Sequence, residues 1–293
     1  MSSLSTPHTN RAAVRTIALL GAVACAGAVY ALWRFFVGTK MGQLIEQSAF
    51  HGSLYGRTRL WTIAEPILNA VSVAYVAVAI LVVVAIALLR KRWMLAVQVV
   101  TVIVGANVTT QLTKKLIFTR PDLDVGWSLA NSLPSGHTTV AASVSLALLI
   151  AVPRFWRPIV ALFGAGFSAA MGISTLVGQW HRPADVYAAL CVSAGWALIV
   201  CAFATSSTHD SDPRRSKAWT AAIIAILSVV TCAGILGAAW FLRDAFISWD
   251  TAHIDSPALQ KNTYIGSVLA VGGLSSLIFG ATLVIRQAVA RMR

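Results

Sequence analysis

The chain has 293 residues, of which 57% are hydrophobic and only 11% are charged. A soluble domain usually carries about 25% charged residues, so this composition argues against a soluble protein and indicates a membrane protein. The net charge of +13 lies in short stretches between apolar runs, which indicates loops held on the cytoplasmic side and no nucleic-acid partner.

Long apolar runs predict eight membrane-spanning helices, because about 20 apolar residues are needed to cross a bilayer. In chain order their approximate limits are 15–37, 67–89, 93–112, 137–152, 159–178, 184–205, 219–242 and 264–285. The first run continues to Phe36 and is too long for a cleaved signal peptide, so an uncleaved helix is favoured. The longest loops are expected at about 38–66 and 243–263.

The distribution of Lys and Arg predicts that both termini are cytoplasmic. With the N-terminus inside, 13 of the 23 basic residues fall on the cytoplasmic side, including the clusters at 90–92 and 214–217. Four of the others, Lys114, Lys115, Arg120 and Arg182, lie in polar motifs and can be held outside by function. We therefore expect an integral, multi-pass plasma-membrane protein whose polar motifs face the extracytoplasmic side. The oligomeric state is left open.

The segment from His181 to Asp185 has the features of a nucleophile at the start of a helix. Pro183 is favoured in a first helical turn, where a negative charge such as that of Asp185 is stabilised. Because His181 and Asp185 are four residues apart, the carboxylate can bind one imidazole nitrogen and leave the other free to act. The alternative is a capped helix with an interfacial histidine.

The segment Pro134-Ser135-Gly136-His137 predicts a turn into a helix. Ser135 can cap the helix, and Gly136 lets the backbone approach a ligand closely. His137 would stand at the helix start, where backbone N–H groups form an anion site. The alternative is an ordinary helix cap.

The segment 114–122 carries cations at the end of the third predicted span. Lys114 and Arg120 would supply fixed positive charge to a phosphate, and the alternative is snorkelling of their side chains to the interface. Together the three segments provide cations, two histidines and a carboxylate, which are the groups that phosphoryl transfer requires. We expect no metal and no other cofactor, because the sequence has no HExxH motif, cysteine cluster or dense carboxylate set.

These segments resemble the signature of the type 2 phosphatidic acid phosphatase superfamily, which includes the vanadium haloperoxidases. That signature reads Lys-x6-Arg-Pro, then Pro-Ser-Gly-His, then Ser-Arg-x5-His-x3-Asp. Residues 134–137 match in full, and so do His181 and Asp185 with their spacing. The resemblance covers roughly 65–205. It implies an all-α polytopic membrane protein with a six-helix phosphatase core in residues 1–205 and two additional transmembrane helices in 206–293.

The resemblance also implies roles for individual residues. His181 would be the nucleophile that becomes phosphohistidine, with Asp185 orienting it. His137 would be the general acid that protonates the leaving group. Ser135 and Gly136 would cradle the phosphate, and Arg120 would be the arginine of the first motif.

Two positions depart from the signature. Lys114 lies six residues before Arg120, where the family has seven, and remains the candidate lysine, with Lys115 as the substitute. The arginine expected six residues before His181 is Thr175, so a main phosphate ligand is missing. We expect Arg182 to supply that charge from another direction.

The function implied is hydrolysis of a lipid phosphomonoester or diphosphate, polyprenyl-linked or phosphatidyl, without a metal. Phe118, Trp127 and Trp180 flank the motifs and are candidates to line the approach of the lipid. The alternative is that they are interfacial anchors, which is favoured for Trp127. The form of the motifs is similar to that of actinobacterial members, which favours cell-envelope intermediates. The alternatives are a lipid phosphotransferase, and a non-catalytic or transport protein that recognises phosphate head groups.

Overall fold

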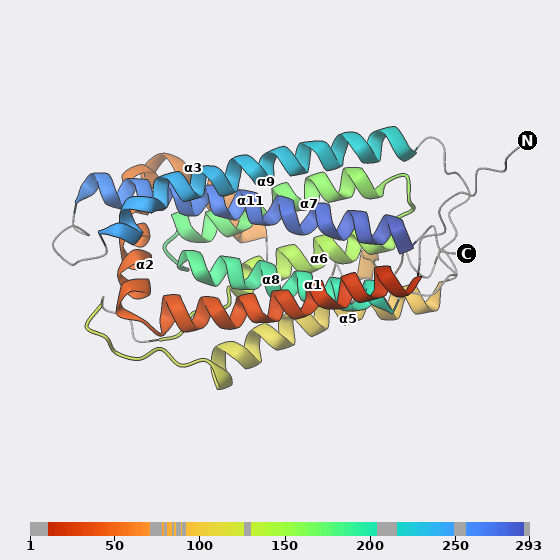
Figure 1. The fold of residues 1–293 in the computed structure, drawn as a ribbon, viewed down its shortest axis with the longest axis horizontal. Helices are drawn as coiled ribbons and strands as arrows, with labels where there is room; N and C mark the ends of the chain where they lie inside the picture. Colours follow the sequence, from red (N-terminus) through yellow and green to blue (C-terminus); the bar gives the residue numbers. More distant parts are fainter. Residues whose placement is uncertain are drawn as a thin grey trace, which may run out of the picture.

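The computed structural model describes residues 11–70, 78, 81–83, 85, 89, 92–125, 130–203, 216–248 and 256–289. Over these residues the chain forms helices and no strands, as expected. Its long helices lie side by side along one axis (Figure 1), and they are α1 (Arg11–Leu32), α5 (Trp93–Leu112), α6 (Gly136–Ala151), α7 (Arg157–Val177), α8 (Pro183–Ala202), α9 (Ser216–Ile247) and α11 (Pro257–Val289).

Six helices of the described part are long and apolar enough to cross a membrane. They cover Arg11–Val37, Trp93–Ile117, Arg157–Val177, Pro183–Ala202, Ala218–Ile247 and Pro257–Val289. Gly136–Ala151 is apolar but shorter, in agreement with the short fourth span. The expected second span, 67–89, lies mostly outside the described residues, so the number of eight stays a prediction.

The expected loop at 38–66 is wrong, because most of this segment is helical. It forms α2 (Lys40–Gly52), a short 3-10 turn (Ser53–Gly56) and α3 (Arg57–Ala70). The side chain of Thr39 caps α2 by accepting a hydrogen bond from the backbone N–H of Gly42, at 3.0 Å. Helix α2 mixes polar with apolar residues. It therefore contains no apolar run long enough to be recognised as a membrane span from hydropathy.

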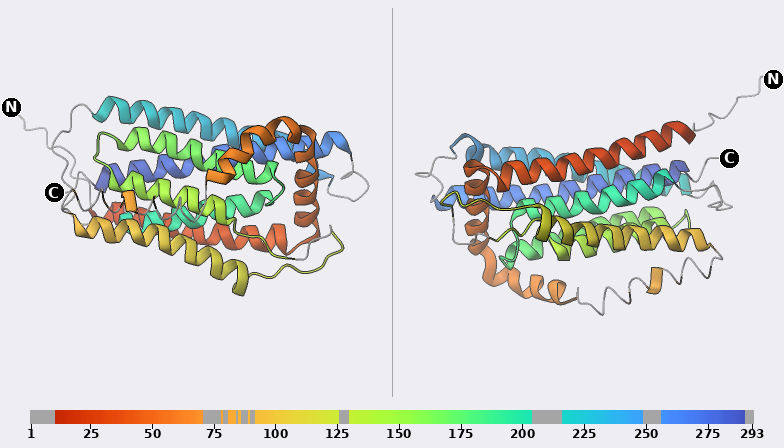
Figure 2. Two further views of the ribbon diagram at one scale, coloured as in Figure 1. Left: turned by 180° about the vertical axis from the view of Figure 1, so that it is seen from behind. Right: turned by 90° about the horizontal axis from the view of Figure 1, so that it is seen from below.

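Helix α2 lies across one end of the bundle, which we call the site end (Figures 1 and 2). Helix α1 begins, and α11 ends, at the opposite end. The start of α1 and the end of α11 thus lie at the same end of the bundle. The distribution of basic residues predicts the same arrangement, with both termini on one side of the membrane.

The core of the bundle is continuous across the predicted boundary at residue 205. One cluster of buried apolar side chains contains residues of α1, α5, α6, α7, α8, α9 and α11. Phe279 of α11 is fully buried against Gly164 of α7, where a Cβ atom would lie 2.5 Å from the Phe279 ring. Helix α11 therefore packs as an integral part of the bundle.

Candidate active site

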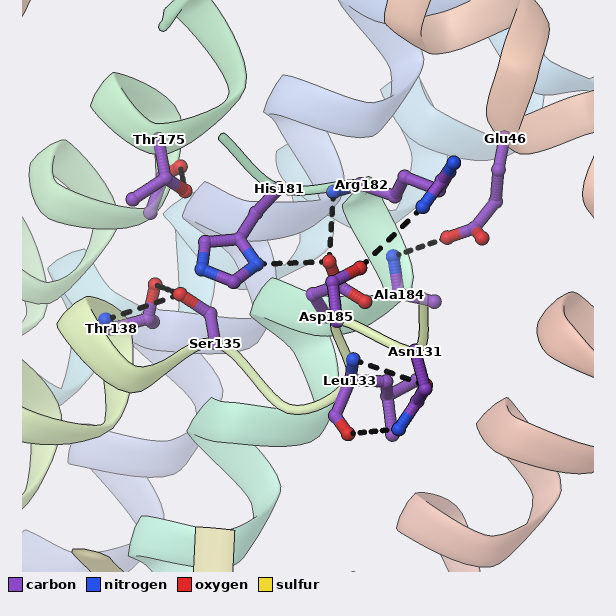
Figure 3. Close-up of polar contacts among 12 residues, drawn as sticks. Glu46, Asn131, Leu133, Ser135, Thr138, Thr175, His181, Arg182, Ala184 and Asp185 are labelled. Carbon is purple, nitrogen blue, oxygen red and sulfur yellow. Dashed lines mark hydrogen bonds and ion pairs between the residues drawn. The ribbon is translucent and has the colours of Figure 1, made fainter. Parts of the chain in front are cut away.

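The side chains of His181 and Asp185 meet at the start of α8. The Nδ1 atom of His181 lies 2.9 Å from Oδ2 of Asp185, and the same oxygen accepts the backbone N–H of Arg182 at 3.0 Å (Figure 3). Asp185 is only 1% exposed. With Asp185 ionised, Nδ1 is the nitrogen that donates to this carboxylate, so the lone pair of Nε2 is available for attack. The contact that the spacing predicts is present.

The second motif is joined to the third by its backbone. Ser135 caps α6 and accepts a hydrogen bond from the N–H of Thr138, at 3.4 Å. Its own N–H donates to the carbonyl oxygen of Asp185, at 2.9 Å. His137 stands in the first turn of α6 and lies within electrostatic range of both His181 and Lys114. The structure thus brings the two histidines into one site.

The first motif begins in a π-helical turn, Thr113–Ile117, that ends α5. Such a turn changes which side chains face inward, and it coincides with the one-residue departure from the family spacing. Lys114 is half-buried and lies within electrostatic range of Asp185. The side-chain amide of Asn131 donates to the carbonyl oxygens of Lys114 and Leu133, at 3.2 Å and 3.0 Å, and so connects the first motif to the second.

The side chain of Arg182 lies on the side of Asp185 away from the His181 ring (Figure 3). The guanidinium of Arg182 extends towards Glu46, and its Nη1 lies 3.5 Å from the hydroxyl of Ser132 (Figure 3). Arg120 lies within electrostatic range of Arg182, Glu46 and Asp185. Burial, followed by the charge of Arg182, lowers the pKa of Arg120. The direction of Arg182 favours a position behind Asp185 over the direct contact with phosphate that we expected.

Thr175, which replaces the family arginine, is fully buried. Its hydroxyl donates to the carbonyl oxygen of Gly172 at 2.7 Å, inside α7. Its own carbonyl oxygen accepts the N–H groups of Trp180 and His181, at 3.0 Å and 3.4 Å. Thr175 thus holds the turn before His181 but contributes no charge.

Sequence reasoning missed two residues of α2 that contact the motifs. Glu46 is 1% exposed, and its Oε1 accepts the N–H of Ala184 at 3.0 Å (Figure 3). Gln43, one turn earlier, donates to the carbonyl oxygen of Pro121 at 3.1 Å. A signal was present, since Glu46 is the first acidic residue of the chain and follows the capping residue Thr39. It was overlooked because 38–66 was interpreted as a loop.

Burial and the nearby charge of Asp185 raise the pKa of Glu46 to about 8. The charges of Arg182 and Arg120 and the N–H of Ala184 act in the opposite direction but do not cancel the effect of burial. The carboxyl group of Glu46 is therefore largely protonated at neutral pH.

Aromatic side chains flank the site. The rings of Trp33 and Phe118 stack with their centroids 4.8 Å apart, and the indole N–H of Trp33 donates to the carbonyl oxygen of Thr119 at 3.0 Å. Trp180 is 47% exposed and its ring lies 5.3 Å from that of His137. Trp127 lies outside the described residues.

Chemically, the site offers a histidine whose Nε2 is free, a second histidine, and several cations around a helix N-terminus. These groups can bind an oxyanion, attack its central atom and transfer a proton. In the described part of the chain, no three His, Cys, Asp or Glu side chains gather so that they could hold a metal ion.

Comparison with known proteins agrees with this site. Residues 95–209 match the family model of the PAP2 superfamily, and this segment contains all three motifs, whereas α2 lies before it. Neither a curated protein nor a solved structure matches the chain. The resemblance seen in the motifs is thus confirmed over residues 95–209, the segment that matches the type 2 phosphatidic acid phosphatase superfamily.

Proposed function

We propose that this membrane protein hydrolyses a phosphomonoester or diphosphate of a lipid through a phosphohistidine on His181. The observation that carries the proposal is the contact between His181 and Asp185, inside the segment that matches the PAP2 superfamily. Members of that superfamily are phosphatases, which supports a phosphate ester as substrate.

The reaction would proceed in two balanced steps. The Nε2 atom of His181 forms a bond to phosphorus while the bond to the leaving oxygen breaks, and His137 gives that oxygen a proton. A water molecule then attacks the phosphohistidine, His137 takes up its proton, and inorganic phosphate is released. Asp185 keeps Nδ1 protonated throughout and stabilises the positive charge on the ring.

Phosphate binding would rest on Lys114, Arg120 and the first N–H groups of α6 around Ser135 and Gly136. A helix N-terminus and fixed cations both stabilise the oxygens of a phosphoryl group. Arg182 would add its charge from behind Asp185, at longer range.

An apolar cavity of 330 Å³ supports a lipid substrate. It lies between α1, α5 and α8, and Thr113 and Phe118, on either side of Lys114, line it. From there it extends along α8 as far as Ile199. A hydrocarbon chain in this cavity would leave its phosphate close to Lys114. We therefore favour a polyprenyl-linked or phosphatidyl phosphate of the cell envelope over a water-soluble ester.

The basic test is phosphate release from a panel of lipid phosphates by the purified protein. We expect activity in EDTA, inhibition by vanadate, and loss of turnover in His181→Ala, with His51→Ala of α2 as the control histidine. Strict dependence on an added divalent metal would contradict the mechanism. Transfer of the phosphoryl group to an added acceptor lipid, in place of phosphate release, would identify a phosphotransferase.

The lipid class has its own test. Ala26 is exposed on α1 and lines the cavity, whereas Ala24 is exposed but does not line it. Ala26→Phe should therefore lower kcat/KM for a long-chain phosphate by about tenfold or more, a loss of about 1.4 kcal/mol, and leave a short water-soluble ester unaffected. Ala24→Phe should change neither substrate. Equal effects of Ala26→Phe on both esters would exclude the cavity as the chain site.

A further inference from the structure

A carboxyl group from outside the matched family segment reaches the reactive turn. Glu46 projects from α2, and its Oε1 accepts the N–H of Ala184 in the first turn of α8. This N–H has no acceptor within its own helix, because the first N–H groups of a helix lack a preceding turn. The reactive segment is thus held by two carboxyl groups, Asp185 from within α8 and Glu46 from α2.

Behind Asp185, polar atoms are buried without partners. In the described part of the chain they include Oε2 of Glu46, Nη2 of Arg120 and Nε of Arg182, which come from α2, the first motif and the third motif. Buried polar groups without partners are rare and usually indicate a ligand, a proton or a bound water. Here they belong to residues that interact electrostatically with one another.

Few charged groups of the described residues act on Glu46. The charged neighbours are Asp185, Arg182 and Arg120, and the titratable Tyr187 of α8 donates its hydroxyl to the carbonyl oxygen of Ser267 in α11, at 3.1 Å. A cavity of 20 Å³ is lined by Glu46 itself, by Tyr187 and, on the side of α9 and α11, by the untitratable residues Leu242, Phe246 and Ser267. This volume holds about one water molecule. The state of Glu46 is therefore decided by burial and by these few charges.

The protonation of Glu46 sets the charge behind the nucleophile. With Glu46 neutral, two guanidinium groups face one carboxylate, so one positive charge remains for a bound anion. With Glu46 ionised, two carboxylates balance the two guanidinium groups, and only the charge of Lys114, which also acts on Asp185, remains. In a buried site, where charges are weakly screened, this difference acts directly on the affinity for phosphate.

We propose that Glu46 is a positioning residue that works as a neutral acid, which anchors the start of α8 and leaves the positive charge of Arg120 and Arg182 to the phosphate. Loss of its proton would then weaken phosphate binding. The inference deepens the proposed function and rests on it only in so far as the site binds a phosphoryl group. Because burial raises the pKa of Glu46 to about 8, the change would fall on the alkaline side of neutrality.

The test is the affinity of the full-length protein for tungstate, a phosphate mimic that stays a dianion across neutral and alkaline pH. In the unsubstituted protein, we expect binding to weaken about tenfold for each pH unit above about 8, because binding is linked to one proton. Glu46→Gln keeps an acceptor for the N–H of Ala184 and stays neutral, so the weakening that begins at about pH 8 should be absent. Gln43→Ala, on the same face of α2, should weaken binding equally at all pH values.

Two results would overturn the proposal: the same alkaline loss of affinity in Glu46→Gln, or disappearance of that loss in Gln43→Ala. Tungstate binding needs no turnover, so this test and the phosphate-release assay can fail separately.

Thermal unfolding gives a second measurement. The folded state raises the pKa of Glu46 from 4.5, so the contribution of this group to stability is full below about pH 4.5 and is lost as pH rises to about 8. Glu46→Gln should remove this decline, so its Tm should exceed that of the unsubstituted protein increasingly up to about pH 8. Parallel Tm curves would contradict a buried neutral acid.

Discussion

At the scale of single residues, one oxygen atom of Asp185 organises the reactive turn. Oδ2 accepts both the imidazole N–H of His181 and the backbone N–H of Arg182. A carboxylate in this position fixes the tautomer of the histidine and the path of the chain at the same time. The geometry of His181, the nucleophile that we propose, therefore depends on a charge that lies just behind it.

Asp185→Asn should lower turnover by an amount on the order of 10⁴-fold, as in a histidine–carboxylate pair that loses its charge. The amide can still accept a hydrogen bond but cannot stabilise a positive ring or enforce the tautomer. The measurement is kcat on a lipid phosphate, together with Tm to show that the variant is folded. Asp122→Asn, at an exposed aspartate, is the control and should stay within about twofold of the unsubstituted protein. Near-normal turnover of Asp185→Asn would remove Asp185 from the mechanism.

The contact of His181 with Asp185 could be predicted because a four-residue spacing after a helix-starting proline is local. The direction of Arg182 could not. Arg182 caps α8 in an extended conformation, with φ −93° and ψ 161°, and neighbouring side chains of an extended chain point to opposite sides. Its guanidinium consequently points away from the His181 ring, towards Glu46.

At the scale of elements, α2 connects the motifs to the rest of the bundle. Its residues Gln43 and Glu46 hold the first and third motifs, while Ser48 lies 3.3 Å from the hydroxyl of Thr263 in α11. At the end of α2, Gly52 packs directly against the backbone of Gln260. The C-terminal helix α11 thus supports α2, and α2 in turn supports the site.

Gly52→Ala should separate α2 from α11, because a Cβ atom at this position would collide with the carbonyl oxygen of Gln260. Overpacking of this kind costs about 1–3 kcal/mol. We expect a lower Tm together with a lower kcat/KM, since Glu46 and Gln43 would shift with α2. Gly166→Ala, where an added Cβ meets nothing within 4 Å, is the matched control. A fall in Tm with unchanged kcat/KM would show that α2 does not position the site.

The long apolar helices could be predicted from composition, whereas α2 could not. A membrane span can be recognised from its own sequence, because it needs about 20 predominantly apolar residues to cross the bilayer. Helix α2 is buried by its neighbours, and it encloses polar residues such as Gln43, Glu46 and Ser48, which hydropathy assigns to the surface. Its burial is a property of the packed bundle.

At the scale of the whole molecule, the bundle has two different ends. Basic residues such as Arg11 and Arg157 begin helices at the end away from the site, while the motifs gather at the site end beneath α2. The positive-inside rule predicts that the site end faces away from the cytoplasm, and this orientation stays a prediction. The integration of α11 into the core could not be predicted. A span of small and apolar residues can pack against many helices, and its sequence does not indicate which ones it contacts.

The orientation can be checked by cysteine labelling in a background without the four native cysteines. Asp122→Cys, in the exposed part of the first motif, should react with a membrane-impermeant maleimide in intact cells. Arg11→Cys, at the start of α1, should react only after the cells are opened. The reverse pattern would place the site in the cytoplasm. The background protein without cysteines controls for non-specific labelling.

The stack of Trp33 on Phe118 has a consequence for how a lipid substrate would be met. Phe118 lines the part of the apolar cavity nearest to Lys114, and Trp33 covers its ring. A chain in that cavity would therefore enter sideways from the bilayer, while the freed phosphate leaves into water. Enzyme and substrate would then meet by diffusion within the plane of the membrane. The rate would follow the mole fraction of the substrate among the membrane lipids, so any other lipid would lower the rate by diluting the substrate.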